Sequence, residues 1–147
     1  FFNFLILMTK KIEARFIIQI AGKPVENVQK ALEVVVEKIK DSKGFKVLSS
    51  EIIDPELDEK TTLYSGLIEI SIRFIDAKDI LGFIVDFTPN SIEIEDPERI
   101  EFDNDELTGI LNDMSSILLE SQTKIRQLNA YVHMQNQKLA KLEEAKK

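Results

Sequence analysis

The chain has 147 residues, 44% of them hydrophobic, which suits one domain of about 100 residues with an appendage and excludes two full domains. It has no cysteine, which excludes disulfides and thiolate metal sites and favours a reducing compartment, with the cytoplasm as the default. The net charge is −7, and residues 45–106 hold 17 acidic against 5 basic groups. Because an acidic surface repels phosphate groups, we expect neither nucleic-acid nor membrane binding.

The first seven residues, 1–7, are nearly all apolar, and Met8 follows them as an ordinary start would. Two interpretations stay open: read-through upstream of a start at Met8, or a truncated chain whose missing part held a membrane span or another domain. The stretch has no basic region and is far shorter than the roughly 20 residues that cross a bilayer. We predict no targeting signal, a folded domain over 8–103 and a C-terminal helix over 104–147.

Residues 11–20 alternate between apolar and polar side chains, which is the period of a half-buried strand. Pro24 then suits the first position of a helix, in which apolar residues recur at helical spacing from Val25 to Ile39. Gly44 follows a lysine-rich last turn and marks the predicted end of this helix.

A second strand is predicted over about 45–53, followed by a polar loop at 54–60. Residues 68–74 alternate again and predict a third strand, which we expect to pair with the second as a hairpin with a long loop.

Asp76 is a candidate cap for a second helix that reaches Phe87, and a short last strand begins at Ile92. The predicted order is therefore strand, helix, strand, strand, helix, strand. This is the order of the ferredoxin-like βαββαβ sandwich, an α+β fold with two helices on one face of a four-stranded sheet.

The most regular pattern lies near the end of the chain, where apolar residues recur at spacings of four and three over five heptads. Asp103 and Glu106 resemble a capping box and predict one helix from there to about Ala145. Nine of the eleven a and d heptad positions are apolar, and the polar ones are Ser121 and Gln135. The nine apolar residues, called the seam below, are Leu107, Leu111, Met114, Leu118, Ile125, Leu128, Val132, Leu139 and Leu142.

Such a narrow seam cannot be buried by a lone helix, and it predicts a coiled coil with a partner helix. Ile125 and Val132 at a, around Leu128 at d, favour a parallel dimer. Further apolar residues at g widen the seam in its first half. An alternative therefore stays open, in which 107–119 folds back onto the domain as a third helix.

Residues that could carry catalysis or bind a metal form no recognised motif. His133 is the only histidine, and it falls on the outward face of the predicted coil, where supporting partners are lacking. The acidic clusters at 54–59 and 96–106 lack the ligand spacing and central glycine of a calcium loop. The third strand lacks the basic start and stacking aromatics of an RNA-recognition motif. We therefore predict no enzymatic activity, no cofactor and no metal site.

Two resemblances to known families bear on this chain. The stretches 21–24, 89–94 and 107–113 are similar to a family of uncharacterised archaeal proteins, which implies no activity. Residues 66–119, above all 92–100, resemble the C-terminal extension of WYL-domain transcription regulators. That resemblance implies a ferredoxin-like fold that assists oligomerisation and effector response. The chain departs from it by lacking a WYL triplet and a DNA-binding helix-turn-helix.

Together these patterns favour a non-enzymatic assembly or protein-interaction module that homodimerises through a parallel C-terminal coiled coil, with an unidentified protein as a possible further partner. The first alternative is a regulatory domain of ferredoxin-like fold that senses a small molecule. It depends only on Gly22 and the fold, and fold does not imply function. The second alternative is a carboxylate- or metal-dependent enzyme that uses the acidic loops.

Overall fold

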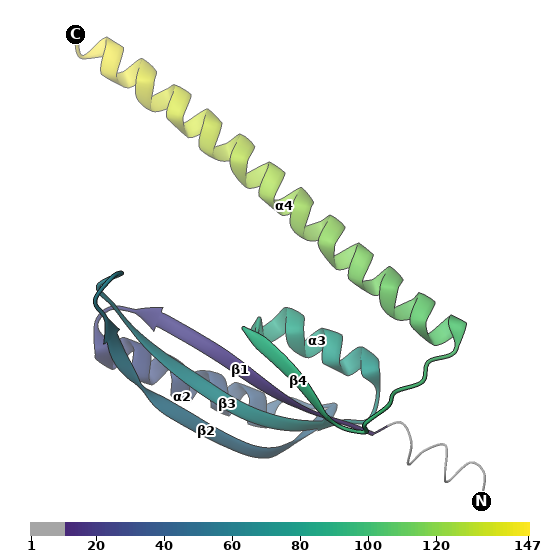
Figure 1. Cartoon of the computed structure of the whole chain (residues 1–147). Helices are drawn as coiled ribbons and strands as arrows, with labels where there is room; N and C mark the ends of the chain where they lie inside the picture. Colours follow the sequence, from purple (N-terminus) through teal and green to yellow (C-terminus); the bar gives the residue numbers. More distant parts are fainter. Residues whose placement is uncertain (1–10) are drawn as a thin grey trace, which may run out of the picture. The chain divides into compact units, whose positions relative to one another are not determined.

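The structure, a computed structural model, describes residues 11–147, so the predicted upstream segment 1–7 lies outside the described residues. The protein is α+β, as predicted, and divides into two compact units between Glu101 and Phe102. Its elements (Figure 1) are β1 (Ile12–Gly22), α2 (Val25–Asp41), β2 (Phe45–Asp58), β3 (Leu63–Phe74), α3 (Ala77–Phe87), β4 (Ser91–Asp96) and α4 (Asn104–Ala145).

The four strands form one antiparallel sheet in the order β2-β3-β1-β4. The predicted pairing of the second strand with the third is confirmed. β1 pairs with β3 along its whole length, and β4 lies on the other side of β1. Asn90 holds the start of β4 in place, because its amide donates to the Ile17 carbonyl at 2.7 Å and its side chain accepts from the Gln19 amide at 2.8 Å.

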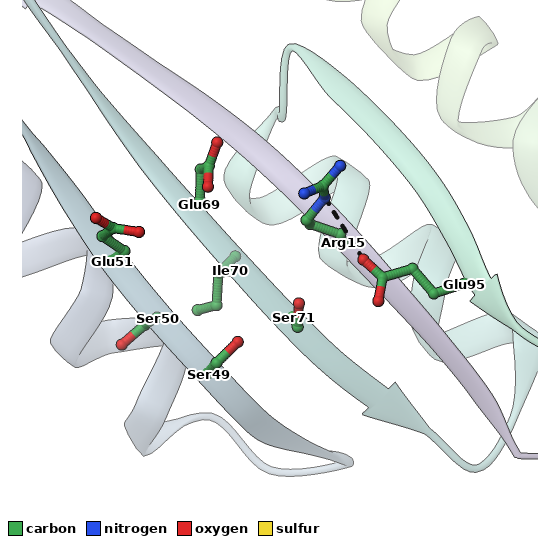
Figure 2. A pocket seen from close by; sticks show the side chains of 8 residues that line it. All are labelled: Arg15, Ser49, Ser50, Glu51, Glu69, Ile70, Ser71 and Glu95. Atoms are coloured by element: carbon green, nitrogen blue, oxygen red, sulfur yellow. Dashed lines mark ion pairs between the residues drawn. The ribbon is translucent and has the colours of Figure 1, made fainter.

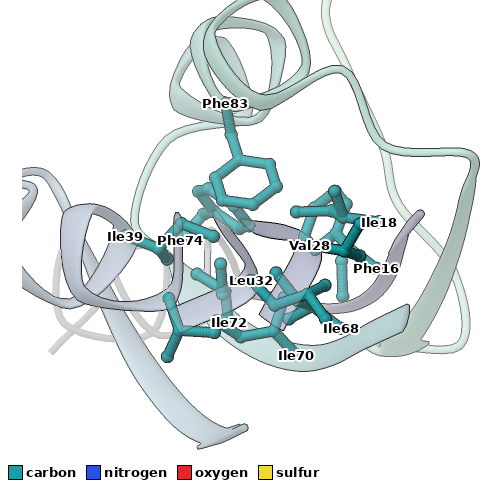
Figure 3. Close-up of a cluster of buried hydrophobic side chains, with 12 residues drawn as sticks. Phe16, Ile18, Val28, Leu32, Ile39, Ile68, Ile70, Ile72, Phe74 and Phe83 are labelled. Carbon is teal, nitrogen blue, oxygen red and sulfur yellow. The ribbon is translucent and has the colours of Figure 1, made fainter. Parts of the chain in front are cut away.

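Both α2 and α3 cover the same face of this sheet and share one hydrophobic core (Figure 3). Alternate residues of β1 and β3 point to that face and are buried, as the two-residue period of a strand requires. The core consists of Ala14, Phe16, Ile18, Val28, Leu32, Val36, Ile39, Ile68, Ile70, Ile72, Phe74 and Phe83.

β2 is longer than the sequence pattern indicates. The predicted loop at 54–60 is wrong for residues 54–58, and the turn between β2 and β3 lies at 59–62. The strand continues to Asp58, and its register against β3 shifts between Ile53 and Glu56. This irregularity takes up Pro55, which has no amide hydrogen to donate to a neighbouring strand. Because β2 is an edge strand, it tolerates a proline and polar side chains that a central strand would not.

The ends of the two shorter helices lie close to their predicted positions. Pro24 is the N-cap of α2, so the helix begins at Val25, one residue later than predicted. Gly44 has a φ of +100°, a conformation that glycine adopts without strain, and it leads the chain from α2 into β2. Asp76 caps α3 as predicted, because its side chain accepts a hydrogen bond from the Lys78 amide.

Asp103 is the N-cap of α4, and its Oδ1 accepts a hydrogen bond from the Glu106 amide at 2.8 Å. We expect Asp103→Ala to destabilise α4 by about 1 kcal/mol, because that amide loses its acceptor. Thermal unfolding followed by helical circular dichroism measures the loss. Asp103→Asn keeps an acceptor oxygen and should retain most of the stability. Equal melting of the alanine variant and the wild type would contradict this role.

Candidate functional site

The predicted seam is exposed along α4. Its nine apolar side chains each leave between 41% and 62% of their surface accessible. α4, which the structure describes from end to end, has 42 residues and no buried one. Monomeric proteins rarely expose large apolar surfaces, and such surfaces mark sites of interaction. The seam is therefore the candidate functional site.

Local sequence explains why this segment forms one helix. At 1.5 Å per residue the helix is about 63 Å long, and the four-three spacing keeps the seam on one side of it. The rest of its surface is mostly polar. Glu120 Oε1 lies 2.8 Å from Lys124 Nζ one turn later, and this hydrogen bond, with the attraction between the charges, lowers the pKa of the Glu120 carboxyl. Such pairs give modest support to an exposed helix.

His133 lies exposed on α4, and its Nε2 is 3.2 Å from Nε2 of Gln137 on the next turn. Among residues 11–147, no acidic side chain forms a hydrogen bond or an ion pair with this ring. Within residues 11–147 no group of three or more histidine, aspartate and glutamate side chains is placed to hold a metal ion.

The open face of the sheet, opposite α2 and α3, carries charged pairs that link neighbouring strands. Arg15 on β1 reaches across to β4, with Nη2 2.7 Å from Glu93 and Nε 3.5 Å from Glu95. The hydrogen bond and charge of Glu93 raise the pKa of the Arg15 guanidinium. Arg73 Nη2 similarly lies 2.8 Å from Glu13. Cross-strand pairs of this kind stabilise strand pairing.

A depression of about 340 Å³ lies on the same open face (Figure 2). Its lining residues are Arg15, Ser49, Ser50, Glu51, Glu69, Ile70, Ser71 and Glu95. Ligand pockets of this size are mainly apolar with a few polar groups, whereas this lining is almost entirely polar. None of its three serines forms a hydrogen bond with one of its three carboxylates, and a nucleophilic site needs such a pairing of nucleophile and base. The depression therefore gives neither the sensing nor the enzymatic alternative a specific site.

Along residues 11–147, no helix combines the length and the apolar character that crossing a bilayer requires.

Fold and surface together define a class: an α+β protein with a four-stranded antiparallel sheet and a long C-terminal helix whose apolar seam is exposed. The chain belongs to the MJ0538 family, whose model matches residues 13–147. This match agrees with the resemblance to an uncharacterised archaeal family. The similarity to the extension of WYL-domain regulators stays a prediction. No curated protein and no solved structure shows significant similarity to the chain.

Proposed function

We propose that the protein is a non-enzymatic assembly module that homodimerises through a coiled coil of α4. The exposed seam carries this proposal. Fully burying one leucine, isoleucine, valine or methionine side chain contributes about 1.5–3 kcal/mol. A seam of nine such residues therefore has enough apolar surface to offset the cost of association. A second copy of α4 offers a matching seam at the same spacing.

Two polar residues of the heptad pattern support a parallel arrangement. Ser121 and Gln135 both take d positions. In a parallel, in-register dimer each meets its own counterpart, so their polar groups can bond to one another. In an antiparallel dimer a d residue opposes an a residue, and every a position from Leu111 to Leu139 is apolar. Each polar group would then lie buried beside an apolar side chain, which is unfavourable.

We also propose that the sheet domain is a ferredoxin-like sandwich. The element order βαββαβ and the strand order β2-β3-β1-β4 support this assignment. A parallel coil would bring two such domains to one end of the dimer, and the module would act by holding them together. Its location in the cytoplasm stays a prediction that depends on the cysteine-free composition.

Ser121→Cys tests the parallel coil, because it places one thiol in an otherwise cysteine-free chain. In a parallel, in-register dimer the two thiols face each other in one d layer, close enough to oxidise to a disulfide. We expect mild oxidation to give a covalent dimer on a non-reducing gel. Thr123→Cys is the matched control, because position f faces away from the partner helix and should cross-link much more slowly.

The two variants also distinguish the possible failures. A dimer in solution that does not cross-link through Ser121→Cys would contradict the parallel orientation and leave dimerisation in place. Equal cross-linking through Ser121→Cys and Thr123→Cys would indicate random collision and contradict the assignment of the seam.

A further inference from the structure

α3 carries more apolar surface than its own sheet covers. Seven of its eleven residues are apolar, but only Phe83 is buried. At 100° per residue, Ile84 and Leu81 follow Phe83 around one flank of the helix, and Val85 lies beyond them. Ile84 and Leu81 are half-buried, and Val85 is 43% exposed.

Asp79 shows which way this flank faces. A Cβ on Gly44 would lie 3.9 Å from the Asp79 carboxyl group, so Asp79 lies on the side of Gly44. Gly44 directly precedes β2, which is the edge strand opposite β4. Asp79 and Ile84 lie on opposite sides of the buried Phe83 around the helix. The apolar flank of α3 therefore faces the β4 side of the sheet.

β4 carries two further apolar side chains on the face of the sheet that the helices cover. Ile92 and Ile94 pair with Phe16 and Ala14 of β1, and paired residues point to the same face, here the face that the helices cover. Nevertheless, Ile92 is 41% exposed and Ile94 is 49% exposed. We call this surface the α3–β4 patch. It consists of Leu81, Ile84, Val85, Ile92 and Ile94.

The charges nearby favour a second copy on this patch rather than on the open face. The carboxylates of β4 alternate with its isoleucines and point to the open face, where Arg15 pairs with Glu93 and Glu95. The five residues of the patch carry no charge. The open face also carries Glu51 and Glu69, and two such acidic surfaces would repel each other.

In the proposed coil, the segment 97–103 between β4 and α4 limits how far apart the sheet domains of the two copies can lie. β4 ends at Asp96 and α4 begins at Asn104, so the segment 97–103 spans at most about 25 Å. In a parallel coil the helix axes lie about 10 Å apart. Two β4 strands tethered so closely have an effective concentration on the order of millimolar. Of the four strands, β4 is the one that this linker follows.

We propose that the α3–β4 patch is a second contact within the dimer, at which the sheet domains of the two copies pack against each other. This inference depends on the proposed coiled coil. At a millimolar effective concentration, a small apolar contact forms although it would be too weak to hold free domains together. Such a contact gives the two domains one defined mutual arrangement.

Single-cysteine variants of the full chain test this contact. Ile92→Cys, Ile94→Cys and Val85→Cys are treated with a short bismaleimide cross-linker. We expect at least one of them to form covalent dimers at least roughly tenfold faster than Ser49→Cys, an exposed residue of β2 on the open face. Adding Leu128→Asp, which removes the coil, should lower that rate to the level of Ser49→Cys.

A charge substitution gives a second, independent readout. We expect Ile94→Lys to lower the melting temperature of the dimer but not that of the Leu128→Asp monomer. Ile75→Lys is the matched control, because Ile75 is an exposed isoleucine of the same unit outside the patch. It should have the same small effect in both backgrounds.

The outcomes separate this inference from the proposed function. If Ser121→Cys forms its disulfide but the three patch cysteines react no faster than Ser49→Cys, the coil stands and the patch contact is wrong. If the patch cysteines react equally fast in the Leu128→Asp background, the contact does not depend on the tether, and the inference is overturned. A monomeric wild type would overturn both.

Discussion

The full chain carrying Leu128→Asp is expected to be a monomer with a folded sheet domain. In the proposed coil Leu128 takes a d position between Ile125 and Val132, where each copy would bury an unpaired carboxylate. Losing the leucine costs about 2–5 kcal/mol, and the buried charge costs several kcal/mol more. The dissociation constant should therefore rise by more than roughly a thousandfold. Sedimentation velocity measures the mass, and circular dichroism follows the fold.

Gln127→Asp is the matched control for this substitution. It introduces the same charge one residue earlier, at position c, which faces water in the coil, and we expect it to remain a dimer. A Leu128→Asp chain that still sediments as a dimer would show that the seam is not the interface. Loss of the folded sheet domain in that variant would show that the seam also supports the domain, contrary to this account.

Phe83→Ala is expected to lower the free energy of unfolding of the sheet domain by about 3–5 kcal/mol. Phe83 is 1% exposed, and its ring centroid lies 4.4 Å from that of Phe16 and 4.9 Å from that of Phe87. Removing the ring leaves a cavity at the point where α3 docks on the sheet. Because domains are stable by only about 5–15 kcal/mol, the loss is a large part of the total.

Gly82→Ala, at the preceding residue, should change stability in the opposite direction. A Cβ at Gly82 would meet nothing within 4 Å, and alanine is favoured over glycine inside a helix by up to about 1 kcal/mol. Urea unfolding of both variants in the Leu128→Asp background gives the two values without a contribution from dimer dissociation. A loss below about 1 kcal/mol for Phe83→Ala would contradict the docking of α3 through this ring.

The features that could be predicted from the sequence are mostly local ones. The cap at Asp103 and the seam of α4 follow from the spacing of residues within one helix, and the structure contains the helix to Ala145 as predicted. The alternation of apolar residues in β1 and β3 likewise identified the buried face of each strand. What the seam binds stays a prediction, because the spacing within one helix does not identify the partner helix.

The features that were missed depend on how distant segments pair. The stretch after Ile53 has the composition of a loop, and only its pairing with β3 makes it a strand. The contact between Arg15 and Glu93 requires β4 to lie beside β1, which alternation alone does not show. Val85 has an apolar side chain of the kind found in cores, and its exposure follows from the way α3 docks on the sheet.

The solution mass of the wild-type full chain, measured by light scattering over a range of concentrations, tests the central claim most directly. One chain has a mass of 16.8 kDa. The account predicts a particle of twice that mass that persists on dilution, because the exposed seam of α4 is buried against a second copy. A mass of 16.8 kDa at every concentration would contradict the proposed dimer.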